Sequence, residues 1–201
     1  QKNDSAPVEE KTDFQQAEID YENGVKIKDS SGREYSLNDD RVKLLVPSMG
    51  GMTTRAFVAA FNYCDIDAVA CPPPGKEELK RGRANSTSKE CLPLQLTLGS
   101  LLNYLDERED EDELLVYFMP EASGPCRFGQ YNVLMNNIIE EKEIEDVALL
   151  TLSANNGYAG MGRQFTLRAW QAVLITDVLE DIYSAIRALA TDQDKALDIF
   201  E

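Results

Sequence analysis

Cysteine is the residue type in this chain whose chemistry is most open to a functional role. The four cysteines lie at positions 64, 71, 91 and 126, and no two of them form a CxxC pair. The chain has no histidine, which excludes Ser-His-Asp and Cys-His catalysis, histidine metal sites and histidine pH switches. Metal ligation by thiolates alone would point to an iron–sulfur cluster or to zinc. The alternative is that the thiols are packed in the core, as free cysteines commonly are.

Short apolar runs alternate with amphipathic segments from residue 42 onward, and this alternation predicts the elements that must position the cysteines. Such alternation indicates a parallel sheet covered on both faces. We therefore expect an α/β fold with a Rossmann-like sheet of about four strands, right-handed crossovers and helices on both faces. The expected strands are 42–46, 68–70, 114–119 and 147–152. The expected helices are 53–64, 76–83, 92–105, 128–141 and 165–190, the last apolar enough to pack on the sheet. Cys64 closes the apolar stripe of the first helix and is expected in the core.

The expected topology places the other three thiols at one edge of the sheet. Cys71 ends the second strand, and Cys126 lies in the loop after the third strand. Cys91 stands at the start of helix 92–105, behind the segment 87–90, which has the form of a capping box. Open α/β sheets bind ligands outside the carboxyl ends of their strands. A helix N-terminus favours the thiolate form that metals require.

Composition divides the chain into three parts. Residues 1–20 are polar and charged, so we expect a linker or disordered tail. Residues 21–40 alternate around a Gly-containing turn, which predicts a short β-hairpin extension. Residues 41–201 hold the α/β domain.

The chain is strongly acidic, with 20 Lys and Arg against 36 Asp and Glu and a formal net charge of −16. This charge repels phosphate backbones and anionic lipid, so neither nucleic acid nor a membrane is an expected partner. No apolar run approaches the roughly 18 residues of a transmembrane helix, and the first residues lack a signal-peptide pattern. We expect a cytoplasmic protein with reduced thiols.

Two cysteine-containing segments resemble one known family. The runs Thr87–Gly99 and Phe118–Tyr131 are similar to the dehydratase-like part of CoA-substrate-specific enzyme activases. These are relatives of 2-hydroxyacyl-CoA dehydratase subunits and of double-cubane iron–sulfur proteins. The resemblance covers about residues 42–190. It implies a Rossmann-like fold in which Cys91 and Cys126 are ligands of a 4Fe–4S-type cluster.

The same resemblance implies a role in ATP-coupled, low-potential electron transfer to a reaction like that of the 2-hydroxyacyl-CoA dehydratases. Arg127 and the backbone near Gly124 would stabilise the negative charge of the cluster. In that family a third cysteine comes from a later α/β unit, so residues 41–201 would be the first half of a longer two-lobed module. Cys71 is a candidate third ligand by its place at the sheet edge and not by the resemblance.

The chain departs from the family in lacking the nucleotide signature of the activase ATPase domain, so ATP hydrolysis would belong to another segment. The chain also has no GxxxxGK[ST] P-loop. The expected partners are therefore the remainder of a larger activase-like polypeptide or a dehydratase subunit, and a homo-oligomer is also open. The competing hypothesis is a metal-free α/β scaffold or interaction domain. With two family-matched thiols, the cluster could be absent from this isolated chain.

Overall fold

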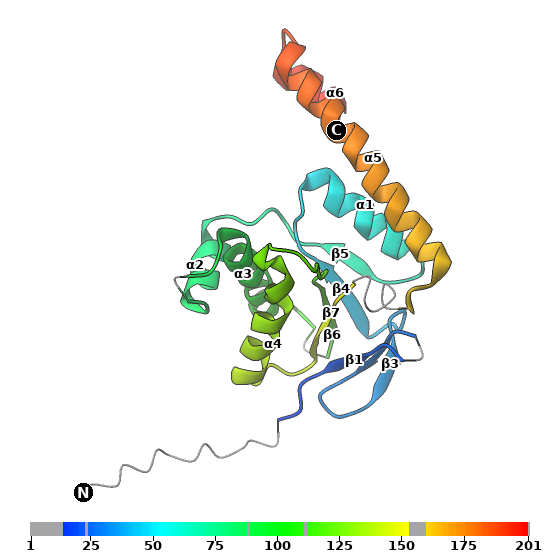
Figure 1. Ribbon diagram of the computed structural model, residues 1–201, viewed down its shortest axis with the longest axis vertical. Coiled ribbons are helices and arrows are strands. Elements are labelled where there is room, and N and C mark those ends of the chain that lie inside the picture. The colour runs from blue at the N-terminus through cyan, green and yellow to red at the C-terminus, as the bar shows by residue number, and fades with distance from the viewer. Residues whose placement is uncertain (1–13, 23, 88, 111, 153–159, 201) are drawn as a thin grey trace, which may run out of the picture.

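The computed structural model contains two β-sheets and describes residues 14–22, 24–87, 89–110, 112–152 and 160–200 (Figure 1). A four-stranded parallel sheet has the order β5-β4-β6-β7, and a three-stranded antiparallel sheet precedes it along the chain. The expected α/β fold with a four-stranded Rossmann-like sheet is confirmed. The parallel strands are β4 (Val42–Val46), β5 (Ala68–Ala70), β6 (Leu114–Phe118) and β7 (Val147–Leu150).

The parallel strands are apolar along their whole length because both of their faces are covered. Every residue of β6 and β7 is buried. Successive residues of a strand point to opposite faces, so Val116 enters one apolar cluster and Tyr117 enters the other. Two layers of apolar side chains therefore sandwich the sheet, which explains the continuous apolar runs of the sequence.

Helices lie on both faces of the parallel sheet (Figure 1). The α1 and α5 helices contribute to one apolar cluster, while α3 and α4 contribute to the other, and α2 packs on α3. The strand order changes direction between β4 and β6, the kind of position at which open α/β sheets bind ligands. The helices are α1 (Gly51–Asn62), α2 (Lys76–Ala84), α3 (Leu92–Glu107), η1 (Arg127–Gln130), α4 (Tyr131–Glu141), α5 (Gly162–Leu189) and α6 (Gln193–Phe200).

The antiparallel sheet corrects the expectation for the first segment. Its strands are β1 (Glu18–Asp20), β2 (Lys26–Lys28) and β3 (Glu34–Ser36). The expected hairpin is β2 and β3, but residues 18–20, expected to end a linker, form β1 and pair with β2. Ile19 lies opposite the buried Ile27, and Glu18 pairs with Lys28 at 3.2 Å. One apolar residue in three is too weak a signal to predict a strand from the sequence. Residues 1–13 of the expected tail lie outside the described residues.

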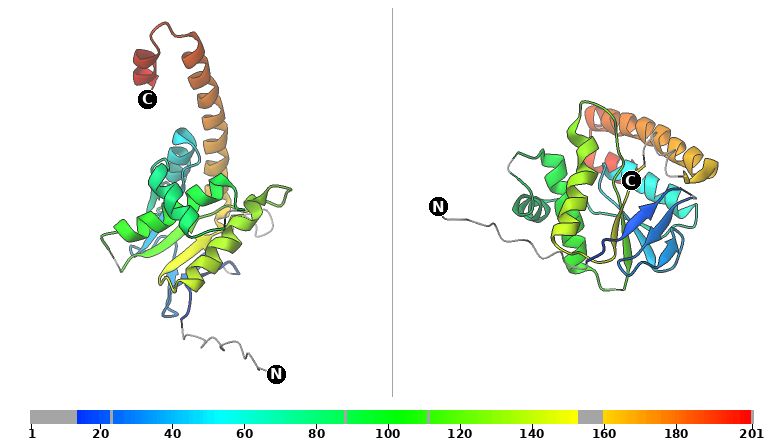
Figure 2. Two further views of the ribbon diagram at one scale, coloured as in Figure 1. Left: turned by 90° about the vertical axis from the view of Figure 1, so that its left-hand side faces the viewer. Right: turned by 60° about the horizontal axis from the view of Figure 1, so that its bottom comes forward.

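The position of α5 also differs from the expectation that helix 165–190 packs on the sheet. Its inner side packs along α1, where the ring centroids of Phe165 and Phe61 are 4.7 Å apart. Ala172 and Thr176 are buried on the same side. Further along, the helix extends beyond the body of the molecule, and α6 folds back beside its end (Figure 2). Within the described ranges, no helix is long and apolar enough to cross a membrane.

Candidate functional site

Cys91 and Cys126 occupy equivalent positions at the beginnings of two helices. Cys91 is the N-cap of α3, and Cys126 is the N-cap of η1, which continues into α4. The Sγ atom of Cys91 lies 2.7 Å from the hydroxyl oxygen of Tyr131, the first residue of α4. Cys126 also acts electrostatically on the Tyr131 phenol. The structure therefore brings Cys91 and Cys126 to one phenol, although they are far apart in sequence.

Tyr131 is buried, and its surroundings keep it protonated. Burial raises the pKa of the Tyr131 phenol, and the hydrogen bond with Cys91 and the nearby Cys126 raise it further. A protonated phenol can donate a hydrogen bond to a thiolate. Tyr131 is thus a hydrogen-bond donor to the Cys91 sulfur whenever that sulfur is deprotonated.

Arg127 connects the two cysteine segments. Its Nη1 atom donates a hydrogen bond to the backbone oxygen of Lys89 at 3.1 Å, which joins the loop after β6 to the loop before α3. A cavity of about 360 Å³ lies beside this junction, and Cys91, Arg127 and Tyr131 are among its lining residues. A cationic guanidinium and the starts of two helices favour negative charge in this place.

The glycines of the loop after β6 have different roles. A Cβ atom added at Gly129 would meet the backbone oxygen of Ala122 at 2.5 Å, so the close approach of the loop to itself requires glycine there. Gly124, the glycine singled out from the sequence, would meet no atom within 4 Å. Gly124 is therefore available for backbone contact with a ligand but is not required by packing.

Cys71 lies in a different environment from Cys91 and Cys126. It is buried in the apolar cluster under α3 and α4, and this burial raises the pKa of its thiol to about 12, although a hydrogen bond with Tyr117 lowers it in part. The Tyr117 hydroxyl donates its proton to the backbone oxygen of Thr97 at 2.9 Å. Burial in apolar surroundings therefore keeps the Cys71 thiol protonated, and a protonated thiol is a poor metal ligand.

Cys64 lies on the opposite side of the sheet. It packs against the cluster that holds Phe61 and Phe118, as expected of a core residue, and burial raises the pKa of its thiol. Within the ranges that the structure describes, no three Cys, Asp or Glu side chains come together in a way that could hold a metal ion. The described residues thus provide two thiols that both act on Tyr131, and no group of three ligands.

The expected capping box before α3 takes another form. Thr87 Oγ1 donates to the Glu90 carboxylate at 2.9 Å, but the helix begins only after Cys91, with Pro93 in its first turn. Proline is favoured there because the first N–H groups of a helix have no internal partner. Cys91 itself, and not the Thr87 segment, is therefore the residue at the helix start.

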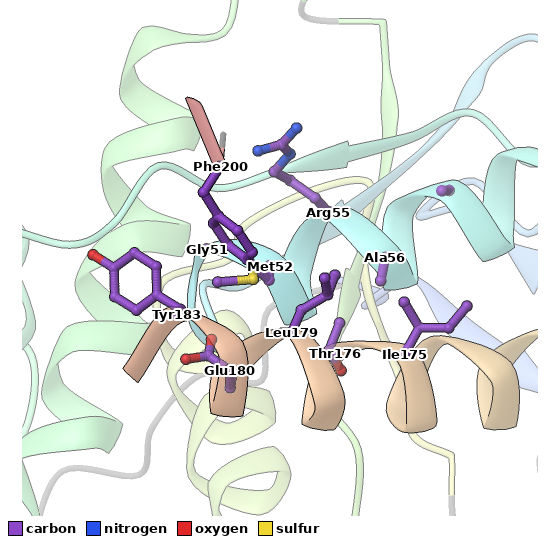
Figure 3. Close-up of a pocket in the computed structure, with 11 residues that line it drawn as sticks. Gly51, Met52, Arg55, Ala56, Ile175, Thr176, Leu179, Glu180, Tyr183 and Phe200 are labelled. Atoms are coloured by element: carbon purple, nitrogen blue, oxygen red, sulfur yellow. The ribbon is translucent and has the colours of Figure 1, made fainter. Parts of the chain in front are cut away.

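A larger cavity, of about 680 Å³, lies between α1, α5 and α6 (Figure 3). Arg55, Glu180, Tyr183 and Phe200 line it together with small and apolar residues of α1 and α5. None of the cysteines is among its lining residues. The candidate site is therefore placed by the chemistry of its side chains and not by cavity size.

No protein-family model, curated protein or solved structure matches this chain. The resemblance to the activases stays a prediction from the two cysteine segments. The geometry around Cys91, Cys126, Arg127 and Tyr131 is consequently the main indication of function.

Tyr131 is a site residue that the sequence does not indicate. Tyr131 is 40 residues from Cys91 along the chain, and no spacing rule connects a helix start to a tyrosine at that distance. A local signal was available for Gly129, because a glycine close to the start of a helix often marks close backbone contact.

Proposed function

We propose that this chain is an iron–sulfur redox domain in which Cys91 and Cys126 supply two ligands of a 4Fe–4S-type cluster. The observation that carries the proposal is the meeting of both thiol segments at Tyr131. Two helix N-termini and the Arg127 cation favour an anionic group at this place. When bound, such a cluster supplies one-electron redox chemistry.

The donor set fits the cluster in part, since it holds two thiols and a cubane cluster needs three or four protein ligands. Cys71 is a poor candidate for the third, because its thiol is buried and protonated. We therefore propose that the remaining ligands come from outside the described residues, from a larger activase-like polypeptide or a dehydratase subunit. The electron acceptor, a reaction like that of the 2-hydroxyacyl-CoA dehydratases, is proposed from the resemblance alone.

The experiment is anaerobic reconstitution in the presence of added dehydratase or activase partner, followed by measurement of iron, acid-labile sulfide and the visible spectrum. We expect iron binding to be lost in Cys91→Ser and Cys126→Ser. Cys64→Ser is the matched control, because Cys64 packs on the other side of the sheet, and it should retain the iron of the unmodified chain. Cys71→Ala should retain it as well. Equal iron in all four variants, or loss in Cys64→Ser alone, would contradict the assignment.

Tyr131→Phe tests the hydrogen bond to the Cys91 sulfur. Hydrogen bonds to cluster sulfurs are among the features that set the reduction potential. We expect Tyr131→Phe to keep the iron and to lower the potential by about 40 mV, which corresponds to one hydrogen bond of about 1 kcal/mol. An unchanged potential in an iron-loaded variant would separate Tyr131 from the site.

A second candidate function is a metal-free interaction domain. It is favoured by the absence of a third ligand beside Cys91 and Cys126 in the part of the chain that the structure describes. It predicts a colourless protein after reconstitution, in the presence and absence of added dehydratase or activase partners. Cys91→Ser and Cys126→Ser would then change only stability.

A further inference from the structure

A row of exposed apolar side chains runs along the outer side of α5. The inner side of this helix carries Phe165, Ala172 and Thr176, which are buried. On the opposite side, Leu167 is 56% exposed, Trp170 57%, Leu174 62% and Val178 58%. We call these four residues the outer stripe. Their spacing of three and four residues places them on one side of the helix.

The outer stripe is more apolar than a solvated helix face requires. Scattered exposed apolar residues are normal on proteins, but a contiguous row of them marks an interaction surface. Among the described elements, none covers the side of α5 that faces away from α1 (Figure 1). Toward its carboxyl end, past the outer stripe, the helix extends beyond the body of the molecule (Figure 2).

Charges at the two ends of the outer stripe are of opposite sign. Arg163 precedes Leu167 by four residues, and Asp181 follows Val178 by three, so both lie on the same side of α5 as the stripe. Both are exposed, and neither makes an ion pair with another described residue. Along the helix, this face therefore carries a positive charge, then the apolar side chains and then a negative charge.

Such a face is complementary to itself when reversed. If a second α5 lies antiparallel, Arg163 of each copy faces Asp181 of the other, and Trp170 of each faces Leu174 of the other. This is the arrangement of an interface with two-fold symmetry, in which the same surface is used by both copies. The rest of each chain lies on the inner side of its own α5. When the two outer stripes meet, the rest of each chain is therefore on the far side of its own helix from the contact.

We propose that a second copy of this chain docks on the outer stripe, forming a dimer through antiparallel packing of the two α5 helices. The inference does not depend on the proposed iron–sulfur function, since α5 contributes no residue to the cysteine site. Trp170 and Leu174 form the centre of the interface. The two Arg163–Asp181 pairs at its ends set the antiparallel direction.

The test is sedimentation equilibrium of the full 201-residue chain from about 1 to 200 µM, a range that covers micromolar dissociation constants. Trp170 is the only tryptophan of the chain. Its emission should therefore move to shorter wavelength as the dimer forms and the indole leaves water. Leu174→Asp should weaken dimerisation by at least about tenfold, because the centre of an interface carries most of the binding energy. Val133→Asp, at an exposed position of α4, is the matched control and should leave dimerisation unchanged.

Exchanging the two charges at the ends of the outer stripe tests whether the partner is a second copy of this chain. Arg163→Glu and Asp181→Arg should each weaken dimerisation, and the double variant should return it to within about threefold of the unmodified chain. A monomer at every concentration would overturn the proposal. A dimer that Leu174→Asp leaves intact would also overturn it, as would a double variant as weak as the single ones. All of these variants change exposed side chains, and circular dichroism verifies that they are folded.

Discussion

At the scale of single residues, the four thiols differ in exposure, and burial raises the pKa of Cys64 and Cys71. Cys126 is exposed, Cys64 and Cys91 are half-buried, and Cys71 is buried with its pKa raised to about 12. The thiolate is the reactive form of cysteine. A group of pKa about 12 is ionised to roughly one part in ten thousand at pH 8.

This difference predicts the order of alkylation. With iodoacetamide at about pH 8, Cys126 should react first and Cys71 should stay unmodified for as long as the chain is folded. Peptide mass spectrometry on quenched samples measures each site. In guanidinium all four should react at similar rates, which is the control for intrinsic reactivity. Labelling of folded Cys71 at the rate of Cys126 would contradict its burial.

At the scale of elements, α2 and α3 approach so closely that two glycines are required. A Cβ atom at Gly82 would overlap the backbone oxygen of Gln95, and one at Gly99 would overlap the backbone oxygen of Glu78. Gly82→Ala and Gly99→Ala should each lower the free energy of unfolding by about 1–3 kcal/mol, because the helices must move apart. Gly51→Ala is the control, since its Cβ would meet no atom within 4 Å. Urea unfolding measures all three, and equal stability would contradict the close approach.

Arg41 holds the antiparallel sheet against the amino ends of the parallel strands. Its guanidinium bonds to Asp29 at 2.8 Å, to Asp146 at 2.6 Å and to the backbone oxygen of Asp112 at 2.7 Å. Asp29 is only 1% exposed. Arg41→Met should therefore cost about 1.5–3 kcal/mol of stability, because it removes one of two cations bonded to a buried carboxylate, while Arg33 stays 2.9 Å from it. Lys26→Met breaks the exposed pair with Glu34 and should cost less than about 1 kcal/mol.

The same cluster gives stability a dependence on acid. Burial by itself raises the pKa of Asp29, but hydrogen bonds from Ser31, the Arg33 backbone and Arg41 outweigh it and lower the pKa below its ordinary value. A carboxyl with a lowered pKa stabilises the fold above its unfolded pKa of about 4, and this stability is lost as the pH falls further. Asp29→Asn should be less stable at pH 7 and should lose less stability on acidification. Urea titrations at pH 7 and about pH 3.5 compare the two chains, and parallel losses would contradict the assignment.

The parallel strands, Cys71 and α5 show which features of the fold could be predicted from the sequence. Strands β4 and β5 have the predicted bounds because apolar runs between helices are a strong local signal. The local sequence does not determine the face of the sheet toward which a side chain at its edge points. Cys71 lies at the predicted edge, but its side chain enters the cluster under α3, because its direction depends on the face that each crossover covers. For α5, periodicity predicted the helix, but its packing on α1 could not be predicted without the positions of both helices.

At the scale of the whole molecule, the formal net charge of −16 acts against compactness. Like charges on a folded chain repel, and dissolved salt screens them. Raising NaCl from about 10 mM to about 150 mM shortens the Debye length from about 30 Å to about 8 Å. The attractive Arg41 cluster is screened less, because Asp29 is buried. Salt should therefore remove more repulsion than attraction.

We expect the melting temperature to rise by about 2–4 °C for each kcal/mol of repulsion that salt removes. The measurement belongs in the Leu174→Asp background, because a change in association would otherwise contribute to the melting temperature. Choline chloride at equal ionic strength is the control, since general screening is independent of the cation. A rise with sodium alone would indicate a bound ion. A fall with both salts would mean that attractive pairs such as those of Arg41 outweigh the repulsion among the 36 acidic residues.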